Sequence, residues 1–135
     1  MSRKIFVNLP VKDLPRAKAF FSALGFAFNP QFTNEQGACM VISEHNYAML
    51  LVERFFQTFT PKRVADARES SEVLLCLSCD SRAEVDALVA KALAAGGKEP
   101  RPPQDHGFMY GRSIEDLDGH IWELMWMDLA PPPQA

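Results

Sequence analysis

The sequence lacks an excess of positive charge. Its 135 residues include 14 Lys and Arg against 17 Asp and Glu, which gives a formal net charge of −3. Proteins that bind nucleic acid or anionic membranes usually carry clustered positive charge. The basic clusters here, such as Lys62-Arg63, are too short for this role. The composition therefore gives no reason to expect nucleic acid or a membrane as a partner.

Long apolar runs are also missing. No window is long enough to span a membrane, and the N-terminal segment turns polar again at Asn8 and Lys12, which is unlike a signal peptide. Apolar residues make up 47% of the chain and charged residues 23%, an ordinary globular balance. These features predict one cytoplasmic domain with a sizeable core.

Cysteine is scarce, with three residues in the chain. An odd number without a secretory signal indicates free thiols in a reducing compartment. Cys76 and Cys79 have the C-x-x-C spacing of some metal and redox sites. They fall within a predicted strand, however, where a separation of three places the two sulfurs on opposite faces. Packing as small hydrophobic residues is therefore favoured, and a zinc or redox site is the alternative.

The sequence does contain a repeated pattern. A predicted strand, Lys4–Pro10, precedes a helix that begins at the N-cap Asp13 and ends at Gly25. Turn residues then separate three strand-like segments, which are Phe26–Phe32, Ala38–Ser43 and Tyr47–Val52. The first half of the chain thus reads as one β-α-β-β-β unit.

The second half repeats this unit. A strand at Val73–Cys79 precedes a helix at Ser81–Gly96, and three strand-like segments follow, which are Lys98–Pro102, Gly107–Ser113 and Ile121–Met127. We therefore predict an α+β fold of two tandem β-α-β-β-β modules, whose curved mixed sheets form a cupped cleft. The single domain covers residues 1–135, with module one at 4–53, a connector at 54–71, module two at 72–127 and a tail at 128–135. The Phe-rich connector is either a packed linker or a lid.

The last predicted strand contains an unusual acid. Alternation places Glu123 on one face with Ile121 and Met125, so a carboxylate lies among apolar residues. A buried carboxylate is costly unless it is paired, hydrogen-bonded, protonated or bound to a metal. Tyr110 and Arg112 share a face of the neighbouring strand, and would reach Glu123 if that face is the inner one. An Arg112–Glu123 ion pair with a purely structural role is the alternative to a functional site.

Two further segments indicate a family. Val11-Lys12-Asp13-Leu14 precedes the first helix, and the chain closes with Asp-Leu-Asp-Gly-His-Ile-Trp-Glu-Leu at 116–124. Together with the two modules, these segments resemble the vicinal oxygen chelate superfamily, which contains glyoxalase I, bleomycin-resistance proteins and extradiol dioxygenases. The closing segment resembles the family's D-P-D-G-x-x-x-E-L motif, with Leu117 in place of Pro. The resemblance covers residues 4 to 127.

This resemblance implies a divalent metal, such as Ni, Zn, Fe or Mn, held in a cleft that is often completed by dimerisation. Glu123 falls on the last of the family's four ligand positions. The other three positions correspond to Phe6, to Leu74 or Val73, and to Leu50 or Met49. A catalytic divalent site normally needs about three protein ligands. His45 and His106 lie in predicted turns, and His120 is expected on the opposite face from Glu123, so the usual metal mechanism is not favoured.

The resulting prediction is a homodimeric protein that binds a small, partly apolar organic molecule and has no assigned cofactor. Its cleft is lined by Phe6, Asn8, Cys76 and Arg112, with Glu123 and Tyr110 as catalytic candidates. The alternative is a divalent-metal-dependent lyase or dioxygenase, similar to lactoylglutathione lyase, that uses Glu123 as one ligand. A purely structural dimer module is the third hypothesis.

Overall fold

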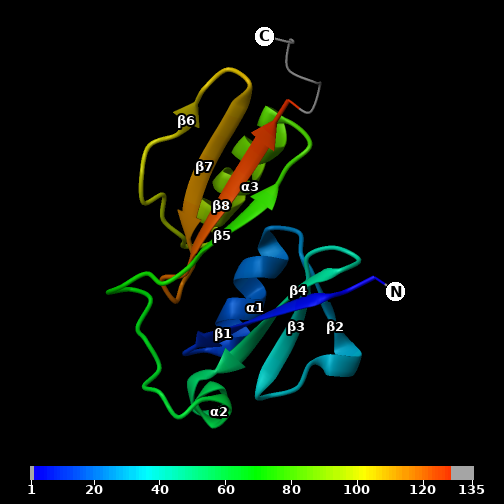
Figure 1. Ribbon diagram of the computed structural model, residues 1–135, viewed down its shortest axis with the longest axis vertical. Helices are drawn as coiled ribbons and strands as arrows, with labels where there is room; N and C mark the ends of the chain where they lie inside the picture. Colours follow the sequence, from blue (N-terminus) through cyan, green and yellow to red (C-terminus); the bar gives the residue numbers. More distant parts are fainter. Residues whose placement is uncertain (1, 129–135) are drawn as a thin grey trace.

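The computed structural model describes residues 2–128 and consists of two modules, each with a four-stranded sheet and one long helix (Figure 1). In module one the sheet has the order β1-β4-β3-β2, in which β1 and β4 are parallel and the other pairs antiparallel. The bounds of its elements are β1 Ile5–Val11, α1 Leu14–Ala23, β2 Ala27–Asn29, η1 Pro30–Phe32, β3 Gly37–Val41 and β4 Asn46–Val52.

Module two repeats this topology with the order β5-β8-β7-β6, again with one parallel pair, β5 and β8. Its elements are β5 Leu74–Ser78, α3 Arg82–Ala94, β6 Gln104–Asp105, β7 Met109–Glu115 and β8 Ile121–Met127. The predicted α+β fold of paired β-α-β-β-β units is confirmed. Of the predicted tail, only Asp128 lies within the described residues.

Equivalent caps start the two long helices. The Asp13 side chain accepts a hydrogen bond from the Arg16 backbone N–H at 3.1 Å, and the Ser81 side chain accepts one from the Glu84 N–H at 3.0 Å. Each bond satisfies one of the N–H groups that an α-helix leaves unpaired at its start. The predicted N-cap Asp13 is confirmed.

The predicted strand at Lys98–Pro102 is wrong. Lys98 makes one isolated bridge to Glu115, and the fourth strand of module two is the two-residue β6. The segment contains Pro100 and Pro102 and is followed by Pro103. Proline has no backbone N–H, so such a segment cannot donate regularly to a strand ladder.

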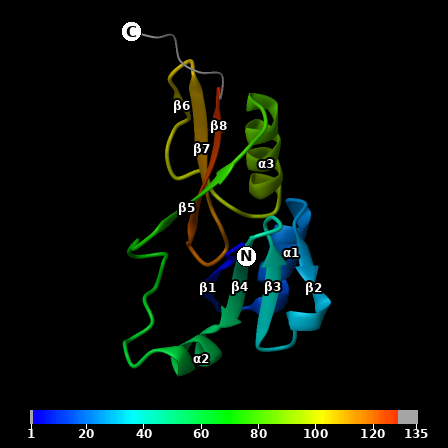
Figure 2. The ribbon, with the colours of Figure 1, turned by 45° about the vertical axis from the view of Figure 1, so that its right-hand side comes forward.

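One hydrophobic core joins the two modules. Each helix covers one face of its own sheet, and α1 also contacts α3 (Figure 2). The ring of Phe21 in α1 meets the ring of Trp122 in β8 edge to face, with centroids 5.3 Å apart. Both side chains are only 2% exposed. Burial of these rings ties the modules into a single packed unit.

The connector is partly helical. It begins with α2 (Glu53–Phe56) and η2 (Gln57–Phe59), and then runs in irregular conformation to Val73. Phe55 and Phe59 pack edge to face at 5.1 Å, although Phe59 remains 63% exposed. Its role as a lid stays a prediction. Between residues 2 and 128, no helix combines the length and hydropathy needed to cross a bilayer.

Candidate functional site

Each sheet has one face that is not covered by the long helix of its module, and we call this its open face. In module one this face carries Phe6, Asn8, Tyr47 and Met49, and in module two it carries Leu74, Cys76, Ile121, Glu123 and Met125. The helix-facing sides carry the alternate, buried residues, such as Leu9 and Leu50. Because strand neighbours in register point to the same side of a sheet, these two sets follow directly from the pairing.

The pairing also identifies equivalent positions in the two modules. Phe6 lies beside Tyr47, and Tyr47 comes two residues before Met49 in β4. In the same way, Leu74 lies beside Ile121, and Ile121 comes two residues before Glu123 in β8. Met49 is therefore the counterpart of Glu123. The sequence left Leu50 and Met49 as alternatives for this position. Leu50 is wrong, because its side chain is buried on the helix-facing side of the sheet.

Leu74 is likewise the counterpart of Phe6. Phe6 lies seven residues before the cap Asp13, and Leu74 lies seven before the cap Ser81. Val73 precedes the first residue of β5 and is therefore not the equivalent of Phe6. Phe6 and Leu74, and Met49 and Glu123, are thus equivalent pairs, and they stand at the four ligand positions that the family resemblance implies.

Glu123 is half-buried and has one ion-pair partner. Its side chain is 26% exposed, and Arg101 Nη2 donates to Oε2 at 3.1 Å. Within residues 2–128, Oε1 has no hydrogen-bond partner of its own. This oxygen can accept a hydrogen bond from a donor group of a bound molecule.

Cys76 lies beside Glu123 in the parallel β5–β8 pair. Burial, and then the nearby charge of Glu123, raise the pKa of the Cys76 thiol above its usual value of 9.0. The thiol is therefore neutral near pH 7 and is a poor nucleophile. Burial raises the pKa of Cys79 further, to about 12, with help from Glu84. The raised pKa of both thiols is unfavourable for redox chemistry, and Cys79 is buried as expected for a packed residue, whereas Cys76 is exposed.

Tyr110 and Arg112 lie on the opposite face from Glu123. In the β7–β8 register, Ser113 stands opposite Glu123, whereas Arg112 stands opposite Leu124 on the helix side. The prediction that Tyr110 and Arg112 line one cleft with Glu123 is therefore wrong. The alternative Arg112–Glu123 ion pair is also wrong, because Arg101 is the partner of Glu123. Counting outward from the five-residue turn at 116–120 would have given this register from the sequence.

Arg112 and Tyr110 instead connect α3 to the sheet. Arg112 donates to both oxygens of Glu99, at 2.8 and 2.9 Å, and to Asp86 at 2.8 Å. The Tyr110 hydroxyl donates to Asp86 at 2.6 Å. Bonding to Arg112 lowers the pKa of Glu99, and bonding to Tyr110 and then to Arg112 lowers the pKa of Asp86. Accepting these bonds occupies the two carboxylates in a structural network.

The residues at the family positions do not fit the usual metal. Phe6, Met49 and Leu74 supply no oxygen or nitrogen ligand, which leaves the carboxylate of Glu123 alone. The histidines do not complete the set, since His120 Nε2 lies 2.8 Å from the carbonyl oxygen of Pro10. Within the described part of the chain, no three His, Cys, Asp or Glu side chains are grouped to hold a metal ion.

Sequence reasoning missed the importance of Asp116. This carboxylate is 7% exposed and accepts hydrogen bonds from the backbone N–H of Asp118 and of His120, and from Trp122 Nε1, each at 3.0 Å. Burial raises its pKa. The signal was present in the Asp-x-Asp-Gly spacing, because Asp side chains commonly bond the backbone two residues on.

The turn that Asp116 organises also touches module one. Asp118 Oδ1 accepts from the backbone N–H of Lys12 at 2.8 Å, and His120 reaches Pro10, so the turn holds the end of β1. Gly119 has φ +91°, and an added Cβ would lie 2.5 Å from the Arg68 nitrogen of the connector. The start of β8, and with it Glu123, is therefore fixed by contacts from two other parts of the chain, the end of β1 and the connector.

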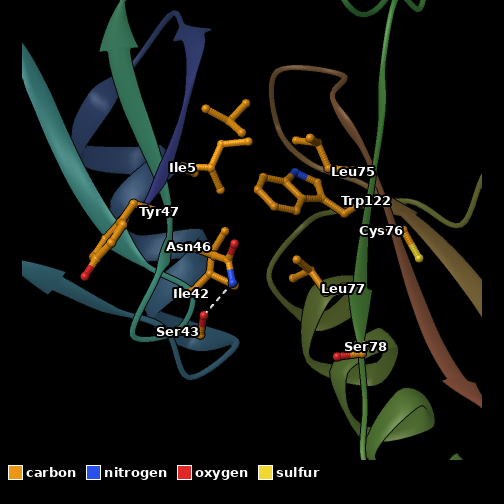
Figure 3. Close-up of a pocket in the computed structure, with 12 residues that line it drawn as sticks. Ile5, Ile42, Ser43, Asn46, Tyr47, Leu75, Cys76, Leu77, Ser78 and Trp122 are labelled. Carbon is orange, nitrogen blue, oxygen red and sulfur yellow. Dashed lines mark hydrogen bonds between the residues drawn. The ribbon is translucent and has the colours of Figure 1, made fainter. Parts of the chain in front are cut away.

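The two open faces point away from each other within one chain. Figure 3 shows Ile5 and Trp122 pointing toward each other across a cavity between the modules, while Tyr47 and Cys76 point away from it on opposite sides. Since Tyr47 and Cys76 belong to the open faces, Phe6, Asn8, Cys76 and Glu123 do not line a single cleft within one chain.

Comparison with known proteins places this geometry in a family. A model described as "Bleomycin resistance protein-like N-terminal" matches residues 3–43. The hypothetical protein SA1046 from S. aureus is 30% identical, over 93% of this chain and 95% of that chain, with a TM-score of 0.78. A glyoxalase-related enzyme from Fulvimarina pelagi is 22% identical, over 97% and 92% of the two chains, with a TM-score of 0.80. The chain belongs to the glyoxalase/bleomycin resistance/dioxygenase superfamily.

Other members of the superfamily share the fold at lower identity. The fosfomycin resistance protein FosX from Listeria monocytogenes is 18% identical, with 96% of each chain covered and a TM-score of 0.69. No curated protein sequence matches the chain significantly. The resemblance found in the closing motif is thus confirmed at the level of the superfamily.

Proposed function

We propose that the protein binds a small, partly apolar organic molecule at the open faces of its sheets, around Glu123, without the metal usual in the superfamily. The observation that carries this proposal is the chemistry of the four family positions. Three are the apolar Phe6, Met49 and Leu74, and the fourth is a half-buried carboxylate with one oxygen available for a ligand. Apolar walls with a single directed polar group are typical of small-molecule sites.

A second copy of the chain is the proposed cover for these faces. Phe6 is 51% exposed and Leu74 is 55% exposed, which leaves large apolar side chains open to water on both sheets. Association of the open face of module one with that of module two in another copy would bury them and bring Phe6 and Asn8 opposite Cys76 and Glu123. Sedimentation of the purified protein should give the mass of a homodimer.

Metal analysis tests the proposal first. Purified protein is measured before and after incubation with Ni, Zn, Fe or Mn, beside Glu123→Ala. We expect well below one metal per chain in every sample. Near one metal per chain that Glu123→Ala abolishes would overturn the proposal, and would favour a metal-dependent lyase or dioxygenase with Glu123 as a ligand.

Glu123→Gln tests the role of the carboxylate. Thermal-shift screening of small metabolites supplies a ligand, and the substitution should weaken its binding about tenfold or more, the scale of a lost charge-assisted hydrogen bond. Glu115→Gln is the matched control, because Glu115 belongs to the same hairpin and the same open face. Equal weakening by both substitutions would contradict a specific role for Glu123, and a metabolite screen without any response would favour a structural dimer module.

A further inference from the structure

A second candidate site is a cavity between the modules. The cavity has a volume of about 360 Å³ and takes its walls from both modules. Module one contributes the start of β1, the β3–β4 turn and the start of β4, and module two contributes β5 and Trp122. This volume lies within the range of small-molecule pockets.

The cavity wall carries no charge. Among the described residues that line it, none is Asp, Glu, Lys, Arg or His. Figure 3 shows Ile5 and Ile42 pointing into it from module one, and Leu75, Leu77 and the Trp122 ring pointing into it from module two. Because Trp122 Nε1 already donates to Asp116, the indole offers this cavity an apolar surface without a free donor. A charged ligand would lose its hydration here without gaining a counter-ion.

One edge of the cavity is polar. Asn46 Nδ2 donates to Ser43 Oγ at 2.7 Å, and Figure 3 shows this pair at the side of the module-one wall. This bond leaves the side-chain oxygen of Asn46, Oδ1, as an acceptor and the Ser43 hydroxyl hydrogen as a donor. A ligand with one hydroxyl or carbonyl group can bond there while its apolar part fills the space beside Trp122.

We propose that this cavity between the modules is a binding site for a small, neutral, mainly apolar molecule with a ring and one hydrogen-bonding group. The side chains that point into the cavity distinguish it from the site of the proposed function, because they lie on the helix-facing sides of the sheets or in the β3–β4 turn. Tyr47 and Cys76 of the open faces also border the cavity, but their side chains point away from it. Ile5 and Phe6 illustrate the separation, since adjacent residues of β1 point to opposite faces.

Three probes with the same ring test the chemistry. Toluene, benzyl alcohol and benzoate are titrated into the full-length protein, and amide chemical shifts are followed by NMR. Benzyl alcohol should bind about fivefold more tightly than toluene, the scale of one net hydrogen bond, and benzoate should bind most weakly. Shifts should concentrate at Ile42, Asn46, Leu75 and Leu77. Tightest binding by benzoate, or shifts confined to the open faces, would overturn the proposal.

Ile5→Trp and Phe6→Trp form a matched pair. Ile5 is 56% exposed and points into the cavity, whereas the neighbouring Phe6 is 51% exposed and lies on the open face. Ile5→Trp should fill the space and weaken benzyl alcohol binding at least tenfold, while Phe6→Trp and Glu123→Gln leave it unchanged. Asn46→Ala should reduce benzyl alcohol to the affinity of toluene, which keeps the test decisive if Ile5→Trp does not fold.

A second copy of the chain is the competing occupant. If it fills the cavity, the probes will not bind and Ile5→Trp will change the sedimentation coefficient, and this result would overturn the proposal. Probe binding that is independent of protein concentration supports a small-molecule site.

Discussion

The β7–β8 hairpin of module two and the β3–β4 hairpin of module one occupy the same place in the repeat but carry different chemistry. Glu123 on β8 corresponds to Met49 on β4. The turn of module two contains a buried carboxylate with three donors, whereas the turn of module one is closed by an exposed bond between Asn46 and Ser43. The two halves of the repeat therefore differ in chemistry, because module two has a carboxylate where module one has a methionine.

Among substitutions that test the difference between the two hairpin turns, Gly119→Ala should have the largest effect on stability. The residue has φ +91°, and an added Cβ would lie 2.5 Å from the Arg68 nitrogen and 2.7 Å from the Ala67 carbonyl carbon, both backbone atoms. Strain and overlap together should lower the free energy of unfolding by about 3 kcal/mol, measured by urea denaturation.

Gly107→Ala is the control for Gly119. Gly107 also has a positive φ, +81°, but an added Cβ meets no atom within 4 Å. Its cost should be about 1 kcal/mol, from backbone conformation alone. Equal losses for the two variants would show that the contact between the turn and the connector contributes nothing.

Asp116→Ala should have the next largest effect. The substitution leaves the Trp122 indole N–H and two backbone N–H groups without their acceptor, in a place that is 7% exposed. The free energy of unfolding should fall by about 2 kcal/mol. Ser43→Ala in the module-one turn should change it by less than about 0.5 kcal/mol, as expected at an exposed site. A similar loss at both turns would remove the contrast between the hairpins.

Glu99→Gln tests the charged contact between β7 and the segment that precedes β6. Arg112 lowers the pKa of Glu99 from 4.5, so this carboxylate stabilises the fold above that pH and loses the contribution as the pH falls through its lowered pKa. The variant should be less stable by about 1 kcal/mol at pH 7, and the two proteins should converge as the pH falls through the lowered pKa of Glu99. Thermal melts across this range provide the measurement, and a constant difference down to low pH would contradict the ion pair.

Glu123→Met makes the two open faces alike and should have the smallest effect on stability. Arg101 is 55% exposed and stays hydrated without its partner. The free energy of unfolding should therefore change by less than about 1 kcal/mol. A larger loss would assign Glu123 to a structural salt bridge, and ligand binding should then survive the substitution.

The sequence was most informative where one residue type is needed for a local reason. The cap Asp13 and the alternation along Ile121–Met127 correctly predicted α1 and β8. Periodicity also predicted the repeat, since a helix or strand must bury one face. The exact register was less accessible, because a shift of one residue moves Arg112 from one face to the other.

Long-range contacts could not be predicted in this way. Neither the pairing of Arg101 with Glu123 nor that of Arg112 with Glu99 follows from local spacing, since each depends on how the proline-rich segment before β6 runs beside β7. The outward direction of the two open faces depends on packing between α1 and α3, which no single element determines. Helical and strand periodicities report which face is buried but not what covers it.

The contact between the module-two turn and β1 has a consequence for the order of events during synthesis. Lys12 and Asp118 are 106 residues apart in sequence, and Pro10 and His120 are 110 apart. A ribosome therefore releases all of module one well before the segment that fastens the end of its first strand has been made. Contacts of such separation slow folding, and domains of nascent chains fold as their parts emerge. The nascent first module must therefore remain incompletely packed, with Phe21 not yet in contact with Trp122, until the closing motif leaves the exit tunnel.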